Sequence, residues 1–137
     1  MRRALTGLIL AAVMAAPLSA QSTEQSAAIE TVIQQQIDAF LQDDFTTAFD
    51  FASPSIQRMF RTPETFAAMV MQGYPMVWRP ASVSFGELWT AEGALWQRVI
   101  VTDDTGQTHE LAYRMEQTGD RWTISAVQII ARPQVAA

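Results

Sequence analysis

The sequence predicts an α+β domain in which N-terminal helices pack on a curved antiparallel sheet of four strands or slightly more. Up to Gly73 the apolar residues recur at steps of three and four, which is the period of an amphipathic helix. From Met76 onward they alternate with polar residues, which is the period of a half-buried strand. Helices first and a strand meander second favour helices that cover one face of the sheet.

A long first helix is expected over about residues 23–42. Apolar side chains at helical spacing place one face of it against the sheet, and these are Ile29, Val32, Ile33, Ile37, Phe40 and Leu41. Polar side chains occupy the other face, at Gln34, Gln35, Asp38 and Gln42. We therefore expect Phe40 to be a core residue.

Shorter helices are expected next, and a capping residue predicts where each of them begins. Asp43-Asp44 ends the first helix and caps the next, because a carboxylate accepts hydrogen bonds from free N–H groups. Ser53-Pro54 and Thr62-Pro63 place a hydroxyl cap before a proline at the first helical position, where no N–H is needed. Gly73 closes the last helix, and Tyr74-Pro75 prevents its continuation. The second helix carries Phe49 on its apolar stripe, so this residue is also expected in the core.

Four strands are expected in the second half, over residues 82–90, 94–102, 108–117 and 121–130. Val83 and Phe85 alternate but Leu88 falls out of phase, which predicts a bulge at Gly86. The third strand alternates cleanly and places four side chains on one face, namely His109, Leu111, Tyr113 and Met115.

Residues 1–20 have the order of a secretory signal peptide. Arg2 and Arg3 form a positive start, and the apolar run from Leu5 to Leu18 follows. This run of 14 residues is shorter than the roughly 20 that span a bilayer. Small residues at Ser19 and Ala20 suit a cleavage site. We therefore expect export to the periplasm or beyond, and no interaction with a membrane after cleavage.

Cleavage after Ala20 would leave 117 of the 137 residues, enough for one domain. We divide them into a polar N-terminal tail and helix start (21–28), a single α+β domain (29–131) and a C-terminal tail (132–137). Seven arginines then face 14 acidic residues, for a formal charge of −7. This balance argues against binding to nucleic acid or to an anionic membrane. Because the chain has no cysteine, its core alone must stabilise it in an oxidising compartment.

The amino-acid sequences of three segments resemble those of a bacterial family known as domain of unknown function 4864. They are Ile-Asp-Ala-Phe-Leu-Gln-Asp-Asp at 37–44, Ala-Phe-Asp-Phe-Ala-Ser-Pro at 48–54 and Trp-Thr-Ile at 122–124. The resemblance covers about residues 29–130. Helices followed by a curved meander also resemble the nuclear-transport-factor-2-like (cystatin-like) fold. The family pattern continues with Gly-Cys near its end, where this chain has Ala126-Val127. The resemblance therefore implies a fold, but no thiol chemistry and no catalytic residue.

His109 is the only histidine and the candidate for acid–base chemistry, since its pKa ordinarily lies close to neutral pH. No nucleophile adjoins it in sequence, so a structural or surface role is the alternative. Asp43-Asp44 reads as a helix stop and cap, and 103–106 as a turn that lacks the ladder of a calcium loop. With one histidine and no cysteine, no metal or cofactor is expected.

Tyr74, Trp78 and Arg79 are the candidate ligand-binding residues. They follow the last helix, where the helical half meets the sheet and a cavity would open. Aromatic rings there can cover an apolar ligand, and Arg79 can pair with an acidic head group. The alternative is that both rings close the core and Arg79 is solvated.

Three functions remain open from the sequence. One is a binding or accessory module for a small apolar molecule or a protein partner. Another is a self-associating structural module, with Trp96 on the outer sheet face as a homodimer surface. The third is an enzyme that uses His109 with a carboxylate.

Overall fold

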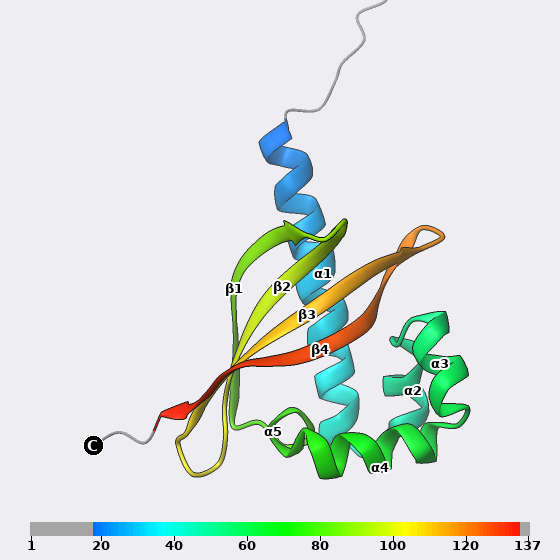
Figure 1. The fold of residues 1–137 in the computed structure, drawn as a ribbon, viewed down its shortest axis with the longest axis vertical. Coiled ribbons are helices and arrows are strands. Elements are labelled where there is room, and N and C mark those ends of the chain that lie inside the picture. Colours follow the sequence, from blue (N-terminus) through cyan, green and yellow to red (C-terminus); the bar gives the residue numbers. More distant parts are fainter. Residues whose placement is uncertain (1–17, 135–137) are drawn as a thin grey trace, which may run out of the picture.

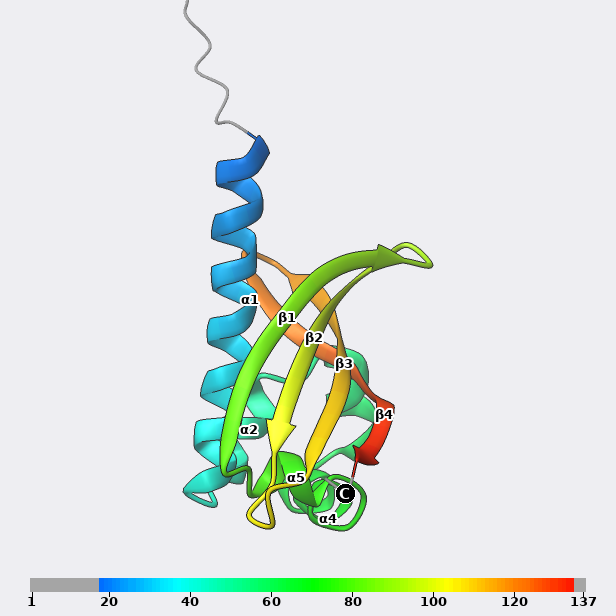
Figure 2. The same ribbon diagram turned by 90° about the vertical axis from the view of Figure 1, so that its left-hand side faces the viewer.

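The computed structural model describes residues 18–134, and its elements follow the predicted order (Figure 1). The helices are α1 (Leu18–Leu41), α2 (Phe45–Asp50), α3 (Pro54–Phe60), α4 (Pro63–Gly73) and α5 (Pro75–Trp78). The strands are β1 (Ser82–Ala91), β2 (Ala94–Thr102), β3 (Thr108–Thr118) and β4 (Arg121–Gln134). The α+β class is confirmed, and α1 lies along one face of a curved sheet, as Figures 1 and 2 show from two sides.

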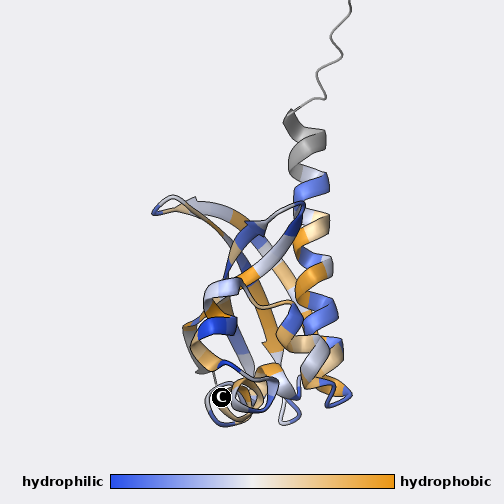
Figure 3. Cartoon of the chain, turned by 90° about the vertical axis from the view of Figure 1, so that its right-hand side faces the viewer, coloured by the Kyte–Doolittle hydropathy of each residue, from blue (hydrophilic) through white to orange (hydrophobic). Residues whose placement is uncertain are grey.

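Helix α1 begins at Leu18, earlier than the expected start, and therefore includes segment 21–28. Its buried face carries Ile29, Ile33 and Ile37, all without exposed surface, and Figure 3 shows the apolar stripe facing the strands. The prediction that Leu41 belongs to the buried face of this helix is wrong, because Leu41 lies at the end of α1 and is 43% exposed. Residues 1–17 of the expected signal peptide lie outside the described residues. None of the helices within 18–134 is long and apolar enough to cross a membrane.

The predicted helix caps are confirmed. The Thr47 amide donates to Asp44 Oδ1 (3.2 Å), the Ile56 amide to Ser53 Oγ (3.4 Å) and the Thr65 amide to Thr62 Oγ1 (3.2 Å). These bonds satisfy amides that the first turn of a helix leaves without a partner.

The chain differs from expectation after Tyr74. Pro75 does not only end α4 but also begins α5, a single turn with proline at its first position.

The sheet is an antiparallel meander in the order β1-β2-β3-β4. The bulge predicted at Gly86 is confirmed by a register shift between Phe85 and Leu88. A Cβ at Gly86 would lie 2.9 Å from Arg98 Cδ, so any larger residue there would require the Arg98 side chain to shift. Buried Gln97 supports the bulge, since its Nε2 donates to the Gly86 carbonyl (2.9 Å) and to the Arg98 carbonyl (2.9 Å).

The main core lies between the helices and the inner face of the sheet. It includes Phe40 and Phe49 as predicted, 1% and 8% exposed. A two-way backbone exchange anchors the helices to β4: the Ser53 amide donates to the Ile124 carbonyl (2.8 Å), and the Ile124 amide to the Phe51 carbonyl (2.9 Å). The segment between α2 and α3 is thereby fixed beside the first half of β4.

A second, smaller cluster lies on the other face of the sheet, where Trp96 packs with Ala94 and Ala112. Trp89 stacks on Trp96 with ring centroids 6.3 Å apart. Trp96 is only 9% exposed as a result, so it offers little surface to a second copy. The homodimer stays a prediction.

Candidate ligand-binding site

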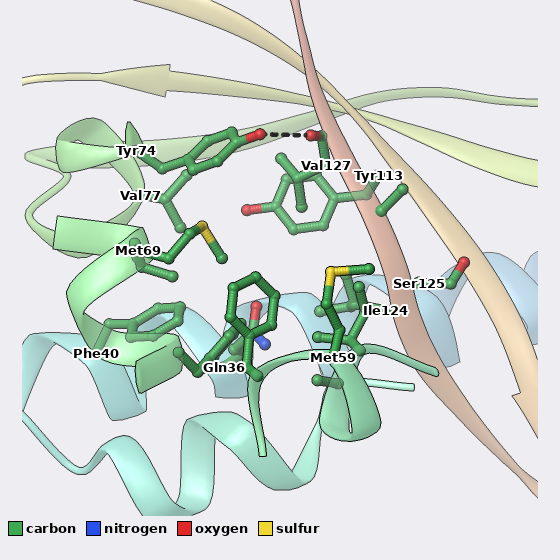
Figure 4. A pocket seen from close by; sticks show the side chains of 16 residues that line it. Gln36, Phe40, Met59, Met69, Tyr74, Val77, Tyr113, Ile124, Ser125 and Val127 are labelled. Atoms are coloured by element: carbon green, nitrogen blue, oxygen red, sulfur yellow. Dashed lines mark hydrogen bonds between the residues drawn. The ribbon is translucent and has the colours of Figure 1, made fainter. Parts of the chain in front are cut away.

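A pocket of about 340 Å³ opens between the helices and strands β3 and β4 (Figure 4). Its helical wall comes from α1, α3, α4 and α5 and from the segments that join α2 to α3 and α4 to α5. The residues of this wall are Gln36, Phe40, Ala52, Ile56, Met59, Phe60, Phe66, Met69, Val70, Tyr74 and Val77. Its sheet wall consists of Tyr113, Ile124, Ser125, Ala126 and Val127. The volume falls at the small end of the range of ligand pockets.

Aromatic rings form the interior of the helical wall. Phe66 lies at their centre, with ring centroids 5.9 Å from Phe40, 5.8 Å from Phe60 and 5.3 Å from Phe49. Separations and tilts of this kind are favourable for aromatic pairs. The rings therefore support one another, and the wall that a ligand would meet is preformed.

Two methionines complete this wall from α3 and α4. Met59 is 68% exposed, whereas Met69 is half-buried. Figure 4 shows both side chains directed toward the pocket. Methionine has three rotatable bonds and a polarisable sulfur, so it adapts to ligands of different shape.

Tyr74, one of the three candidate ligand-binding residues, lines the pocket. Its hydroxyl donates to the Val127 carbonyl at 2.9 Å, a bond drawn in Figure 4. This bond ties the junction of α4 and α5 to β4. The Tyr74 hydroxyl proton is thereby used within the protein.

Tyr113 reaches the pocket from β3 and differs from Tyr74 in its bonding. Its side chain is completely buried, yet its Oη has no hydrogen-bond partner among the described residues. Burial raises the pKa of Tyr113, and the neighbouring Tyr74 raises it further. The phenol therefore remains protonated at neutral pH. Figure 4 shows its oxygen directed into the pocket, toward the helical wall.

The other polar side chains of the lining are neutral, and each makes at least one hydrogen bond within the protein. Gln36 Nε2 donates to the Ala48 carbonyl (3.1 Å), and Ser125 Oγ donates to the Arg114 carbonyl (3.2 Å). The lining contains no Asp, Glu, Lys, Arg or His. The pocket is thus an apolar chamber with a buried phenol, Tyr113, that has no partner among the described residues.

Trp78 and Arg79 lie outside this lining, at the end of α1. Trp78 Nε1 donates to Asp43 Oδ1 (3.0 Å), and Arg79 Nη2 lies 2.7 Å from the same oxygen. Arg79 Nη1 donates to the Phe40 carbonyl (2.7 Å), and its guanidinium lies 4.2 Å from the centre of the Trp78 ring. Arg79, followed by Trp78, holds the pKa of Asp43 below its ordinary value. These residues clamp the α1–α2 corner, so the structure places only Tyr74 of the three at the pocket.

His109 is buried with its side chain 8% exposed, and it does meet a carboxylate. Its Nε2 lies 2.8 Å from Asp103 Oδ2 in the β2–β3 turn. Asp103 Oδ1 accepts from the Thr105 hydroxyl (2.6 Å), the Thr105 amide (3.0 Å) and the Gln107 amide (3.0 Å). These bonds, those of Thr105 and His109 first, hold the pKa of Asp103 well below its ordinary value. The pair fixes the turn and is not part of the pocket lining.

Within residues 18–134, no group of three or more His, Cys, Asp or Glu side chains is arranged to hold a metal ion.

The fold and this site define a small α+β domain with an apolar, preformed pocket between its helices and its sheet. The chain belongs to the family described as a domain of unknown function, DUF4864, whose model matches residues 22–137. No curated protein and no solved structure matches the chain. The nuclear-transport-factor-2-like fold expected from the sequence therefore stays a prediction.

Sequence reasoning missed most of the pocket lining. The alternation of the third strand places Tyr113 on one face with Leu111 and Met115, but does not assign it to a site. The signal in the sequence that could have indicated a site is a tyrosine between two apolar residues on the same face of the strand. Met59 and Ile56 lie in the short helix expected after Ser53-Pro54, and no local pattern distinguishes an apolar helix stripe that meets the core from one that borders a cavity.

Proposed function

We propose that this protein is a binding module for a small, largely apolar molecule. The observation that carries the proposal is the apolar pocket of about 340 Å³ with its preformed aromatic wall. Apolar pockets with few polar groups are the usual form of small-molecule sites.

The alternative of an enzyme based on His109 receives less support from the geometry. Acid–base catalysis requires the base to lie within hydrogen-bond reach of a bound substrate. His109 Nε2 is directed to Asp103, and neither residue lines the pocket. Binding without chemistry is therefore the function that the site favours.

Methionine methyl groups provide the direct test of binding. Protein labelled with ¹³C at the methionine methyl is titrated with ethylbenzene, a small apolar probe, and followed by NMR. Met69 lines the pocket, whereas Met71 belongs to the same helix and does not. A saturable shift of the Met69 signal with an unchanged Met71 signal is expected.

A filled pocket provides the matched control. Met69→Trp places a large ring in the chamber and should abolish ethylbenzene binding, which is then monitored at Met59. Met71→Trp adds the same ring outside the lining and should leave the shift of Met69 unchanged. Absence of any saturable shift in the unmodified protein would contradict the proposed function.

We also propose that the protein acts after export. The support is the positive start and 14-residue apolar run of the first 20 residues, together with a family match that begins directly afterwards, at residue 22.

A further inference from the structure

We infer that the ligand of this pocket is a neutral molecule with an aromatic or alicyclic body and one carbonyl oxygen, and that the Tyr113 hydroxyl donates a hydrogen bond to that oxygen. Ketones, esters and lactones share this chemistry. The inference rests on the proposed function and names the ligand class for the same site.

The donor is the first argument. A buried hydroxyl nearly always has a hydrogen-bond partner, and each exception calls for an explanation. Tyr113 is completely buried, and its Oη has no partner among the described residues although its side chain lines the pocket. Tyr74, the neighbouring phenol, has its proton engaged at the Val127 carbonyl. A ligand acceptor in the pocket would satisfy the remaining group.

Because no side chain of the pocket lining is charged, the pocket favours a ligand whose hydrogen-bond acceptor is neutral. An ionised carboxylate loses its hydration on entering an apolar site, and a nearby cation must compensate for it. None of the sixteen lining residues is a cation. Arg79, the cation considered from the sequence, is bound to Asp43 at 2.7 Å and to the Phe40 carbonyl at 2.7 Å. Fatty-acid anions and other carboxylates are therefore disfavoured.

The helical wall of the pocket favours a ring system as the apolar part of the ligand. On the helical wall, the ring of Phe66 packs against the rings of Phe40 and Phe60, whereas Tyr113 belongs to the sheet wall. Flat rings on the ligand would stack on such a wall, and the chamber of about 340 Å³ accommodates a small ring system more readily than a long chain.

Three probes of similar size separate these contributions. Ethylbenzene has the apolar body alone, acetophenone adds a neutral carbonyl, and benzoate replaces it with a carboxylate. Dissociation constants are measured from the Met69 methyl signal for the unmodified protein, Tyr113→Phe and Tyr74→Phe. Tyr74→Phe is the matched control, because it removes a pocket hydroxyl whose proton is already engaged.

In Tyr113→Phe, acetophenone should bind about tenfold more weakly relative to ethylbenzene, a change of about 1.4 kcal/mol. Tyr74→Phe should leave the ratio of the two dissociation constants unchanged. Benzoate should bind at least about tenfold more weakly than acetophenone to the unmodified protein. An unchanged ratio in Tyr113→Phe, or tighter binding of benzoate, overturns the inference while ethylbenzene binding leaves the proposed function standing. Failure of all three probes to shift Met69 overturns both.

A measurement on the unmodified protein does not depend on the folding of a variant. The carbonyl stretching frequency of bound acetophenone, recorded by infrared difference spectroscopy, should fall below its value in an alkane solvent because of the donated hydrogen bond. A frequency equal to that in alkane overturns the assignment of Tyr113 as donor.

Discussion

Replacing Gln97 with leucine should destabilise the protein by about 1–2 kcal/mol, although leucine has a similar size and the site is fully buried. Gln97 Nε2 donates to the carbonyls of Gly86 and Arg98, each at 2.9 Å. Leucine leaves both carbonyls without this donor, at about 2 kcal/mol each.

Part of this loss is offset. Gln97 Oε1 is buried without a partner in the described structure, so its removal relieves an existing penalty of about 1–2 kcal/mol. The leucine side chain adds a smaller gain from buried apolar surface, about 1 kcal/mol. The expected net loss in the free energy of unfolding is therefore about 1–2 kcal/mol.

Urea unfolding measures this difference as a lower midpoint at an unchanged slope. Gln128→Leu, at an exposed position of β4, is the matched control and should change the midpoint little. A midpoint for Gln97→Leu equal to or above that of the unmodified protein would refute the reasoning, because the bulge would then not need the amide.

The other predictions concern the core, a cap, the β2–β3 turn and the N-terminus. Phe49→Ala should lose about 3–5 kcal/mol in urea melts, because its ring packs 5.3 Å from that of Phe66, and a loss below about 1 kcal/mol would show that this face was misread. Asp44→Ala should lose about 1 kcal/mol by thermal or urea unfolding, since the Thr47 amide loses its acceptor, and no loss would deny the cap. Asp103 has a lowered pKa in the folded state, so its contribution is complete above its unfolded value of about 4 and declines as the pH falls below it. Stability measured from pH 6 to 3 should therefore fall less in Asp103→Asn than in the unmodified protein, and parallel curves would argue against this role. N-terminal sequencing of the exported protein should begin at or near Gln21, whereas an intact Met1 on a cytoplasmic protein would exclude a cleaved signal.

Local chemistry explains why so much of the fold was predictable from the sequence. Helix caps at Asp44, Ser53 and Thr62 depend on a side chain and an amide three residues later, so a short window of sequence contains the whole interaction. Alternation along β3 likewise reveals its buried face, and the phase change after Phe85 reveals the bulge.

The site was less predictable because it depends on distant contacts. Arg79 was expected at the pocket, but the single turn of α5 and an ion pair with Asp43, 36 residues away, direct it to the end of α1. Tyr113 is a candidate donor because its hydroxyl has no hydrogen-bond partner among the described residues. A pattern of residues in the sequence does not reveal that a partner is missing. Sequence periodicity identifies which side chains turn inward, whereas the distance between two inward faces decides whether they meet or leave a cavity.

The backbone exchange between Ile124 and the α2–α3 segment has a consequence for the order of assembly. Ile124 to Val127 form most of the sheet wall of the pocket, and they belong to β4, which leaves the ribosome after the other three described strands. Contacts this distant in sequence form late, because the intervening chain must lose entropy before they contribute. The aromatic wall can therefore gather early from neighbouring helices, while the chamber closes only when the final strand docks. Ligand binding would then report completion of folding, and a chain truncated before β4 would have no chamber to fill.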